Sequence, residues 1–294
     1  MVAYSHYSDA RDSWGASYFC TRFSRCPFYL YFVLIMAIDL NPTIKFESVS
    51  VILPLINETH SLKRVVETVL QHSERDILEF IIVVCHKTTP ESLQACDELK
   101  ARLGDRFILK YQKLPYLGGA IREGFEAAKG SHTVVMFSDG ESDPETVKDL
   151  IAESRRFPEA IVSASRWIQG GKFEGYDPLK IYYNLAAQRF FAWLYGSPLT
   201  DLTFGFRIFP TQLIDSIRWQ EIKHPFVFES ILKPMRLGVP IIEIPTVWRA
   251  RNEGMSQIVL LSYLRYFWIG FKYRFYPKEK MVKEVLEHRY VNAA

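Results

Sequence analysis

The chain has 294 residues, is 48% hydrophobic and 15% aromatic, and carries a formal net charge of +3 at pH 7. This length and composition suffice for a large buried core in one or two α/β domains, and so mild a charge excludes nucleic acid as the main partner. The four cysteines show neither metal-ligand nor CxxC spacing, and no apolar run reaches the length of about 18 to 20 residues that spans a bilayer.

Residues 1–45 are expected to form an N-terminal extension. Its first 26 residues are rich in Ser, Tyr and Arg without periodicity, which is typical of a partly disordered segment. The apolar segment 27–38 is too short to cross a membrane, so we expect it to contact a membrane interface or to pack against the domain. Both Met1 and Met36 fit a natural start.

Strands and helices alternate over the next part of the chain. The pattern predicts strands at 48–55, 79–85 and 107–111 and helices at 62–72, 90–103 and 117–129. Thr89 is expected to cap the second helix, which Pro90 begins, and Gly130 is expected to end the third in the left-handed conformation. Strands that alternate with helices at this spacing predict a parallel, Rossmann-like sheet.

The stretch 133–144, TVVMFSDGESDP, is an apolar strand that ends at three acidic residues. Asp139 and Glu141 follow the carboxyl end of the strand, where parallel sheets collect function, in a turn that Gly140 allows to bend tightly. Two hard oxygen ligands at this spacing suit Mg²⁺ or Mn²⁺, which take the rest of their shell from water and phosphates. The alternative is a solvated turn whose last aspartate caps a helix at 145–156.

The second half of the chain is less regular. Its predicted elements are a strand at 160–165, a helix at 178–195 that Asp177 caps and Gly196 ends, a strand at 203–209, a helix at 226–237 and a strand at 239–247. No repeat or low-complexity linker separates the two halves. We therefore expect one domain at 46–256 with two lobes, about 46–144 and about 145–256.

The segment 257–276, QIVLLSYLRYFWIGFKYRFY, places leucines and aromatic residues at helical spacing, with Arg265, Lys272 and Arg274 between them. This pattern predicts an amphipathic helix of the kind that lies at a membrane interface. The alternative is a C-terminal helix packed on the domain, because core helices share the pattern. A polar tail completes the segment 257–294.

Five short motifs point to a known family. They are VILPLINE at 51–58, LGGAIREG at 117–124, DGE at 139–141, DLTFGFR at 201–207 and RNEGMS at 251–256. Their order resembles that of the family-2 glycosyltransferases of GT-A fold, and most of all the polyprenol-phosphate sugar transferases of the dolichol-phosphate mannose synthase type. The resemblance covers about residues 49–256.

The resemblance implies a mixed, mostly parallel sheet flanked by helices. It also implies an inverting, metal-dependent transfer of a sugar from a UDP- or GDP-linked donor to a polyprenyl phosphate. The enzyme is expected in the cytoplasm, bound peripherally to the cytoplasmic face of a membrane. Two alternatives stay open: a family-2 enzyme that acts on a sugar or lipid hydroxyl, and a non-catalytic nucleotide-sugar-binding protein of the same fold.

The donor site is expected in the first lobe. By the resemblance, its residues are Pro54, Asn57, Glu58, Gly118, Gly119 and Arg122, with Arg251 and Ser256 closing over the donor diphosphate. The two glycines would let the backbone approach the donor where a helix begins. For Glu58 the alternative is a charge that favours a helix start, and for the arginines it is an exposed surface position.

Two departures from the family pattern concern the metal and the base. Asp139 aligns with the second aspartate of the Asp-x-Asp metal motif and Glu141 with the metal-touching residue after it, but Phe137 replaces the first aspartate. Mg²⁺ or Mn²⁺ is therefore expected to be held mainly by these two carboxylates and the diphosphate. After the second strand, VCHK at 84–87 replaces the usual Asp-Asp-Gly-Ser. The nucleotide thus stays open, and His86 either substitutes for these aspartates or is solvated.

The acceptor site is expected in the second lobe. Arg166 and Lys180 match positions where the family meets the acceptor phosphate, and a cation suits phosphate recognition. A phosphate acceptor is already ionised at neutral pH, whereas a hydroxyl acceptor would need a base such as Asp201 to take its proton. Arg207 is expected either to order the loop after Asp201 or to bind phosphate.

Overall fold

A computed structural model of the chain describes residues 44–250 and 260–283. The chain divides into two compact units, Met1–Pro42 and Thr43–Ala294, and all the described residues lie in the second. The predictions for the N-terminal extension and its apolar segment fall outside the described residues, as do those for 251–259 and 284–294.

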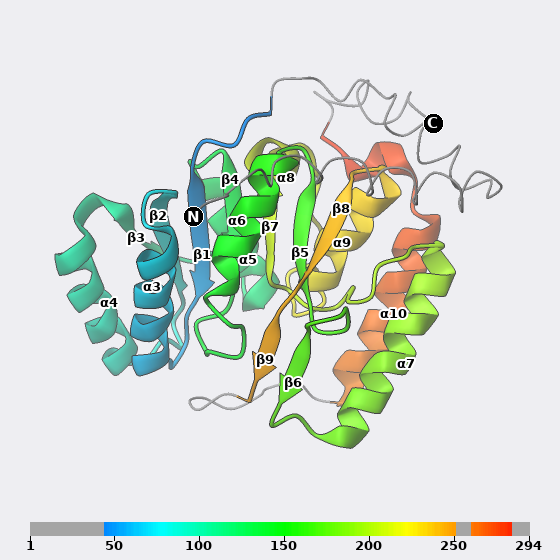
Figure 1. Cartoon of the computed structure of the whole chain (residues 1–294), viewed down its shortest axis with the longest axis horizontal. Coiled ribbons are helices and arrows are strands. Elements are labelled where there is room, and N and C mark those ends of the chain that lie inside the picture. The colour runs from blue at the N-terminus through cyan, green and yellow to red at the C-terminus, as the bar shows by residue number, and fades with distance from the viewer. Residues whose placement is uncertain (1–43, 251–259, 284–294) are drawn as a thin grey trace, which may run out of the picture. The chain divides into compact units, whose positions relative to one another are not determined.

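A seven-stranded sheet with the order β3-β2-β1-β4-β7-β5-β8 lies at the centre of the second unit (Figure 1). Its strands are β1 Val49–Pro54, β2 Ile77–Val84, β3 Phe107–Tyr111, β4 His132–Val135, β5 Ile161–Ser165, β7 Arg207–Pro210 and β8 Ile241–Pro245. Neighbouring strands are parallel, except that β7 runs antiparallel to β4 and β5. A parallel pair, β6 Lys172–Glu174 and β9 Val247–Arg249, forms a second sheet. The predicted mixed, mostly parallel sheet is confirmed.

Helices cover both faces of the large sheet (Figure 1). On one face lie α3 His60–Ser73, α4 Pro90–Leu103 and α6 Thr146–Arg156, and on the other lie α5 Tyr116–Ala127, α7 Pro178–Tyr195, α8 Thr211–Ser216, α9 Phe226–Arg236 and α10 Leu260–Phe275. Successive side chains of β1 point to opposite faces of the sheet. Val51 and Leu53 pack with the layer formed by α3, α4 and α6, and Ile52 packs with the layer on the other face.

Side-chain caps and a glycine define helix ends as predicted at three places. The Thr89 hydroxyl accepts a hydrogen bond from the backbone N–H of Ser92 at the start of α4. Asp177 accepts from two backbone N–H groups at the start of α7, and Gly196 ends that helix with φ of 60°. These ends are encoded locally, because capping needs only a few neighbouring residues.

At two other helix ends the structure differs from the prediction. Gly130 does not have a positive φ, and α5 ends earlier, at Ala127. A Cβ on Gly130 would lie 2.6 Å from the backbone nitrogen of Ser50, so the glycine instead lets the chain pass close to β1. Helix α6 begins at Thr146, and the Asp143 carboxylate accepts from a backbone N–H in the turn before it.

The second half of the sheet also differs from the prediction. The strand expected at 203–209 is confined to β7, and the one expected at 239–247 divides into β8 and β9. The division follows from a change of partner at Thr246, whose N–H donates to the Ser165 carbonyl (3.0 Å) and whose carbonyl accepts from the Lys172 N–H (3.1 Å). The chain thereby leaves the large sheet and pairs with β6.

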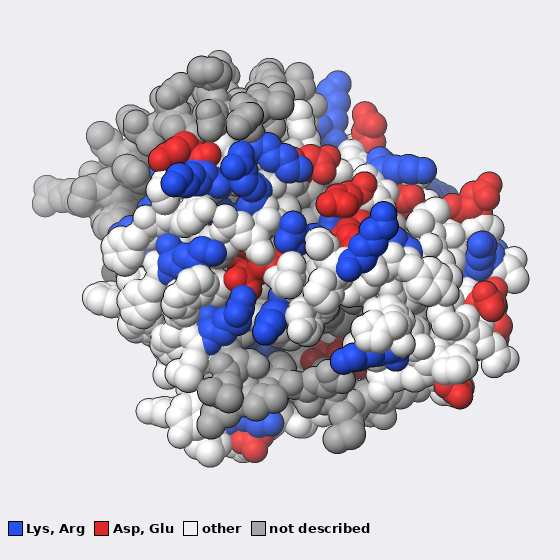
Figure 2. Space-filling model, turned by 180° about the vertical axis from the view of Figure 1, so that it is seen from behind, with Lys and Arg blue, Asp and Glu red and all other residues white. Residues whose placement is uncertain are grey.

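Helix α10 packs on the domain through one face, as the alternative reading predicted, and presents an apolar stripe on the other. The stripe consists of Leu264, Phe267, Trp268, Phe271 and Phe275, which are 39–75% exposed. The face toward the body buries Ile269 and Tyr273, and Arg265 beside it pairs with Glu221 (2.8 Å). Figure 2 shows the molecule from behind, with a largely uncharged area on the side where α10 lies. Within the described residues, no helix is both long and apolar enough to cross a membrane.

Candidate functional site

The turn after β4 carries the two predicted metal ligands. Gly140 bends it with φ of 76°, and a Cβ there would lie 2.9 Å from the Arg64 guanidinium, so the predicted role of this glycine is confirmed. The Asp139 side chain is almost buried, and its Oδ1 accepts a hydrogen bond from the Glu141 backbone N–H (3.0 Å). Both carboxylates therefore stand at the carboxyl end of β4, beside the end of β1.

The donor set in this turn fits a metal site that substrate completes. Among the described residues, no group of three or more His, Cys, Asp or Glu side chains is arranged to hold a metal ion. Phe137, in the place of the family's first aspartate, points elsewhere, since its ring lies 3.0 Å from the position that a Cβ on Gly205 would take. Asp139 and Glu141 supply the hard oxygen atoms that Mg²⁺ or Mn²⁺ needs, with water and phosphate for the remaining positions.

Strand β9 and an aromatic wall surround Glu141. The Trp248 indole N–H donates to Glu141 Oε2 (3.2 Å), and the Arg249 backbone N–H donates to the Glu141 carbonyl (2.9 Å). Two further rings continue the wall beyond Trp248. The Tyr176 centroid lies 4.6 Å from that of Trp248, and the Phe173 centroid lies 5.3 Å from that of Tyr176. This wall leads from the acidic turn to Arg166.

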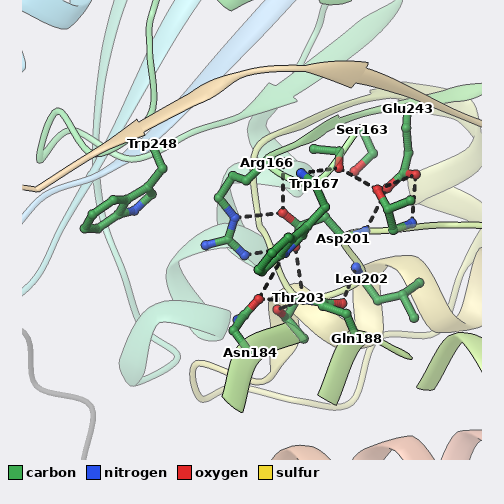
Figure 3. Close-up of polar contacts among 12 residues, drawn as sticks. Ser163, Arg166, Trp167, Asn184, Gln188, Asp201, Leu202, Thr203, Glu243 and Trp248 are labelled. Atoms are coloured by element: carbon green, nitrogen blue, oxygen red, sulfur yellow. Dashed lines mark hydrogen bonds and ion pairs between the residues drawn. The ribbon is translucent and has the colours of Figure 1, made fainter. Parts of the chain in front are cut away.

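Arg166 and Asp201 form a buried, two-pronged ion pair (Figure 3). Arg166 Nε donates to Asp201 Oδ2 (2.7 Å) and Nη2 donates to Oδ1 (2.9 Å), while the Arg166 backbone N–H also donates to Oδ2 (3.2 Å). The guanidinium lies over the rings of Phe204 (4.5 Å) and Phe173 (5.1 Å). Its position is thus fixed both in its plane and from its faces.

The charges of both Asp201 and Glu141 act on the Arg166 guanidinium. Burial acts to lower the pKa of its guanidinium, but the charge and hydrogen bonds of Asp201 outweigh burial and raise that pKa. The charge of Glu141 contributes in the same direction, so Arg166 lies within electrostatic reach of the predicted metal ligands. A cation is thereby held permanently charged beside the acidic turn.

Asp201 is enclosed by further hydrogen bonds (Figure 3). Gln188 Nε2 donates to Asp201 Oδ1 (3.1 Å), and the Asp201 backbone N–H donates to Glu243 Oε1 (2.9 Å). Glu243 also accepts from the backbone and hydroxyl of Thr200, and burial, partly offset by these bonds, raises the pKa of Glu243. Both oxygens of Asp201 are occupied by protein donors, and the side chain is buried.

The two other predicted acceptor residues lie in contrasting places. Arg207 is fully buried and donates to Ser163 Oγ (2.9 Å), Ser230 Oγ (3.1 Å) and the carbonyls of Val227 (2.6 Å) and Leu202 (2.9 Å). Burial lowers its pKa to about 10. Arg207 therefore holds the loop after Asp201, which agrees with the first of the two roles predicted for it. Its guanidinium does not reach the surface, where it could bind a phosphate. Lys180 lies in the first turn of α7 and is exposed.

The end of β1 places the first group of predicted donor residues at the same edge of the sheet. The Pro54 carbonyl accepts from the Ser138 hydroxyl (2.8 Å), which joins this end to the acidic turn. Glu58 folds back on its own turn, where Oε2 accepts from the backbone N–H groups of Ile56 (3.0 Å) and Asn57 (3.1 Å). The Asn57 side chain is exposed beside it.

The start of α5 holds the second group. A Cβ on Gly118 would lie 2.6 Å from the Ile222 backbone, and the Gly119 N–H donates to the Ile222 carbonyl (3.0 Å). The close approach at these glycines is therefore made by the chain's own backbone. Arg122 lies toward α9, where burial lowers the pKa of Lys233 against the opposing charge and hydrogen bond of Glu229, and the charge of Arg122 adds to the lowering. Arg251 and Ser256 lie outside the described residues.

Sequence reasoning did not single out several residues that build this site. They are Phe173, Gln188, Phe204, Glu243 and Trp248. Gln188 carried a usable signal, because it is a polar residue on the most apolar part of its helix. The others are brought to the site by loops and strands that are distant in sequence. His86, in the loop after β2, is exposed.

Comparisons with known proteins agree with this arrangement. The family model described as glycosyl transferase family 2 matches residues 50–217. Glycosyltransferase AglD of Haloferax volcanii is 26% identical over 226 residues, which are 72% of this chain and 34% of that protein. The undecaprenyl-phosphate mannosyltransferase of Micrococcus luteus is 28% identical over 148 residues, 48% of this chain and 60% of that protein. The chain thus spans less than two thirds of the length of either relative.

A further curated relative and the solved structures extend the comparison. The polyprenol monophosphomannose synthase of Mycolicibacterium smegmatis is 23% identical over 71% of this chain and 80% of that protein. Glucosyl-3-phosphoglycerate synthase from Mycobacterium tuberculosis, in complex with Mn²⁺, UDP-glucose and phosphoglyceric acid, has a TM-score of 0.61 at 15% identity over 82% of each chain. The structure with Mg²⁺ and UDP has a TM-score of 0.57 at 16% identity, again over 82% of each chain. These likenesses confirm the predicted fold.

Proposed function

The chain belongs to glycosyl transferase family 2, and we propose that it transfers a sugar from a nucleotide-sugar donor to the phosphate of a polyprenyl phosphate. The observation that carries this proposal is the clamped guanidinium of Arg166. In the described part of the chain its hydrogen bonds all go to Asp201, through Nε and Nη2. Nη1 is left for an anion, and Glu141 of the acidic turn lies within electrostatic reach.

The state of Asp201 supports a phosphate acceptor over a hydroxyl acceptor. A general base must have a free lone pair directed at the proton that it removes. Both oxygens of Asp201 instead accept from Arg166, and Gln188 adds a further donor. Asp201 acts as the partner that orients Arg166, and an ionised phosphate can attack without a base.

The acidic turn is proposed as the donor end of the reaction. Asp139 and Glu141 would hold Mg²⁺ or Mn²⁺, which when bound neutralises the charge that develops on the leaving nucleoside diphosphate. Trp248 fixes the direction of the Glu141 carboxylate through its indole N–H. Pro54, through its link to Ser138, keeps the end of β1 against this turn, where the nucleotide of a UDP- or GDP-linked sugar is proposed to lie.

The outward stripes of α7 and α10 support a lipid acceptor and peripheral contact with a membrane, whose cytoplasmic face we propose as the site of contact. On α7, the exposed apolar side chains are Leu179, Tyr182, Tyr183 and Trp193, at 61–75%. On α10, Lys272 lies against the Trp268 ring (5.1 Å), and Arg274 against the Phe275 ring (5.6 Å). Aromatic rings with neighbouring cations are the combination that favours the boundary between lipid headgroups and acyl chains.

The names of the relatives support the same class of acceptor. Two of the curated relatives described above are named for undecaprenyl phosphate or for a polyprenol phosphate. The structural relatives contain UDP-glucose with Mn²⁺ or UDP with Mg²⁺, which supports metal-dependent use of a nucleotide-linked donor. The particular sugar is left to experiment.

The test is a transfer assay with a panel of radiolabelled UDP- and GDP-sugars, polyprenyl phosphate and Mg²⁺ or Mn²⁺. We expect metal-dependent label in the organic extract, labile to mild acid, and its loss with Asp139→Ala. Asp201→Asn serves as the second variant. Release of nucleoside diphosphate without lipid label, abolished by Asp201→Asn, would replace the proposal with transfer to a hydroxyl. Binding of a nucleotide sugar without any turnover would replace it with a non-catalytic role.

A further inference from the structure

Helix α7 joins the proposed membrane surface to the phosphate site. Its outward face carries the apolar stripe that includes Tyr182, Tyr183 and Trp193. Its inward face presents two amide side chains, Asn184 and Gln188, which lie one helical turn apart. Figure 3 shows both reaching from α7 toward the pair formed by Arg166 and Asp201.

Gln188 makes the more direct connection. It is 2% exposed, and its Nε2 donates to Asp201 Oδ1 (3.1 Å) and Thr203 Oγ1 (2.6 Å). Its Oε1 accepts from the Leu202 backbone N–H (2.8 Å). One amide therefore holds three consecutive residues of the loop after α7, and it uses both its donor and its acceptor.

Asn184 makes a parallel connection one turn earlier. Its Oδ1 accepts from the Trp167 indole N–H (3.1 Å), and Trp167 directly follows Arg166 in the chain. The Trp167 ring packs on Phe173 (4.8 Å), which is one of the two rings beneath the guanidinium. Helix α7 is thus connected to Arg166 in two ways, through Asp201, which pairs with the guanidinium, and through Trp167, which follows Arg166 in the chain.

We propose that Gln188 is a positioning residue that fixes Arg166 at a set depth relative to the outward stripe of α7. This inference rests on the proposed function. The phosphate of a membrane lipid is confined to a narrow range of depth, so the group that binds it must be registered to the surface that contacts the membrane. The hydrogen bond from Gln188 to Asp201 supplies that registration, because Asp201 in turn holds Arg166.

The variant Gln188→Glu tests this role with almost no change in size. A carboxylate cannot donate to Asp201, whereas the protonated acid can donate to it and accept from Leu202. Position 188 faces Asp201 and Arg166, with Glu243, Arg207 and Tyr176 behind them. Burial beside Asp201 disfavours the charged form, so the introduced acid is expected to have a raised pKa and to regain the amide's function as pH falls.

We expect Gln188→Glu to raise KM for polyprenyl phosphate about tenfold or more at about pH 8, with KM for the sugar donor unchanged. The ratio of the variant's KM for polyprenyl phosphate to that of wild type should fall toward one as pH falls to about 6. A residue with only a structural role would move both KM values, or kcat, without this rescue. Equal effects on donor and acceptor, or a ratio that does not change with pH, would overturn the proposal.

Gln220→Glu is the matched control. Gln220 also lies in a polar network, since its Nε2 donates to the Tyr276 hydroxyl (2.8 Å) and its backbone N–H donates to the buried carboxylate of Glu229 (2.9 Å). Within the described residues, the hydrogen bonds of Arg166 go to Asp201 and not to this network. The same substitution there is expected to leave KM for polyprenyl phosphate unchanged at both pH values.

A readout without substrate separates this inference from the proposed function. In wild type, the Nε–H of Arg166 is held by Asp201, and its NMR signal should exchange slowly with solvent. In Gln188→Glu, exchange should be faster at about pH 8 than at about pH 6. Absence of transfer by wild type would refute the proposed function alone, whereas unchanged exchange in the variant would refute the positioning role.

Discussion

The two helical layers of the sheet differ in the outer faces that they present. In α3, the buried side chains include Leu62, Val65 and Val69, so its apolar face points inward. In α10, Ile269 and Tyr273 are buried on the inner face, but the most exposed side chains are apolar as well. The first arrangement is that of a helix in water, and the second is that of a helix whose outer face meets an apolar environment.

Their ion pairs differ in the same sense. Between α3 and α4, Lys63 pairs with Glu98 and Arg102 with Glu67, and all four side chains are 31–55% exposed. In α9, Glu229 and Lys233 pair at 2.6 Å with no exposure. The first layer thus has its ion pairs at the surface and the second buries one, while the outer face of α10 presents apolar side chains with Lys272 and Arg274 beside them.

The largest effect on stability is expected from Glu229→Gln. Lys233 would then be buried without a charged partner, and the backbone N–H groups of Gln220 and Glu221 would lose their acceptor carboxylate. We expect the free energy of unfolding to fall by about 3–5 kcal/mol, measured by urea denaturation. A loss below about 1 kcal/mol would show that this layer has no stronger electrostatic anchoring than a surface pair has.

The next effect concerns the outward stripe. Replacing Trp268 and Phe271 together by Glu adds two charges to the apolar face of α10. We expect binding to lipid vesicles, measured by flotation, to weaken on the order of 100-fold, because two aromatic side chains no longer enter the interface. Phe157→Glu, at the end of α6 in the other layer, is the control and should not change vesicle binding. Equal effects in both layers would remove the distinction between them.

A smaller effect is expected from a buried histidine on β4. Burial lowers the pKa of His132 below 6.5, although a hydrogen bond to the Pro158 carbonyl (2.9 Å) acts in the opposite direction. The folded state therefore disfavours the proton, and stability should fall as pH drops from 6.5 toward the lower folded pKa. His132→Gln should flatten this dependence in urea titrations across that range. An identical pH dependence in variant and wild type would contradict the assignment.

The smallest effect is expected from Glu67→Gln. Its partner Arg102 lies at 2.9 Å, but the two side chains are 55% and 49% exposed. Water and salt screen such a pair, so the free energy of unfolding should change by roughly 0–1 kcal/mol. A change as large as that of Glu229→Gln would mean that exposure does not govern the strength of ion pairs in this molecule.

Local signals in the sequence predicted the fold well where neighbouring residues decide. Thr89, Asp177 and Gly196 mark helix ends that the structure confirms. The direction of β7 was not readable, because a short apolar strand does not encode which neighbours it pairs with. The prediction for Gly130 was wrong for a related reason. A glycine is needed there because the chain passes close to β1, which is far away in sequence.

The site was predicted in part for the same reason. Motifs located Asp139, Glu141 and Arg166, each of which ends or follows a strand at one edge of the sheet. The motifs did not show which of these side chains form hydrogen bonds or ion pairs with one another. The sequence offered Asp201 as the base for a hydroxyl acceptor, whereas in the structure Asp201 holds Arg166. For Arg207 it left loop ordering and phosphate binding open, and the buried position in the loop agrees with the first. These pairings arise from tertiary packing, which spacing does not reveal.

The most direct test of the central claim compares two acceptors. One is a long polyprenyl phosphate in vesicles, and the other is a short, water-soluble prenyl phosphate, each assayed with wild type and with the double Glu variant of Trp268 and Phe271. We predict that the variant loses most of its kcat/KM for the vesicle-bound acceptor and retains wild-type kcat/KM for the soluble one. Equal losses with both acceptors, or none with either, would contradict the division between an outer face that meets the membrane and an inner site that binds phosphate.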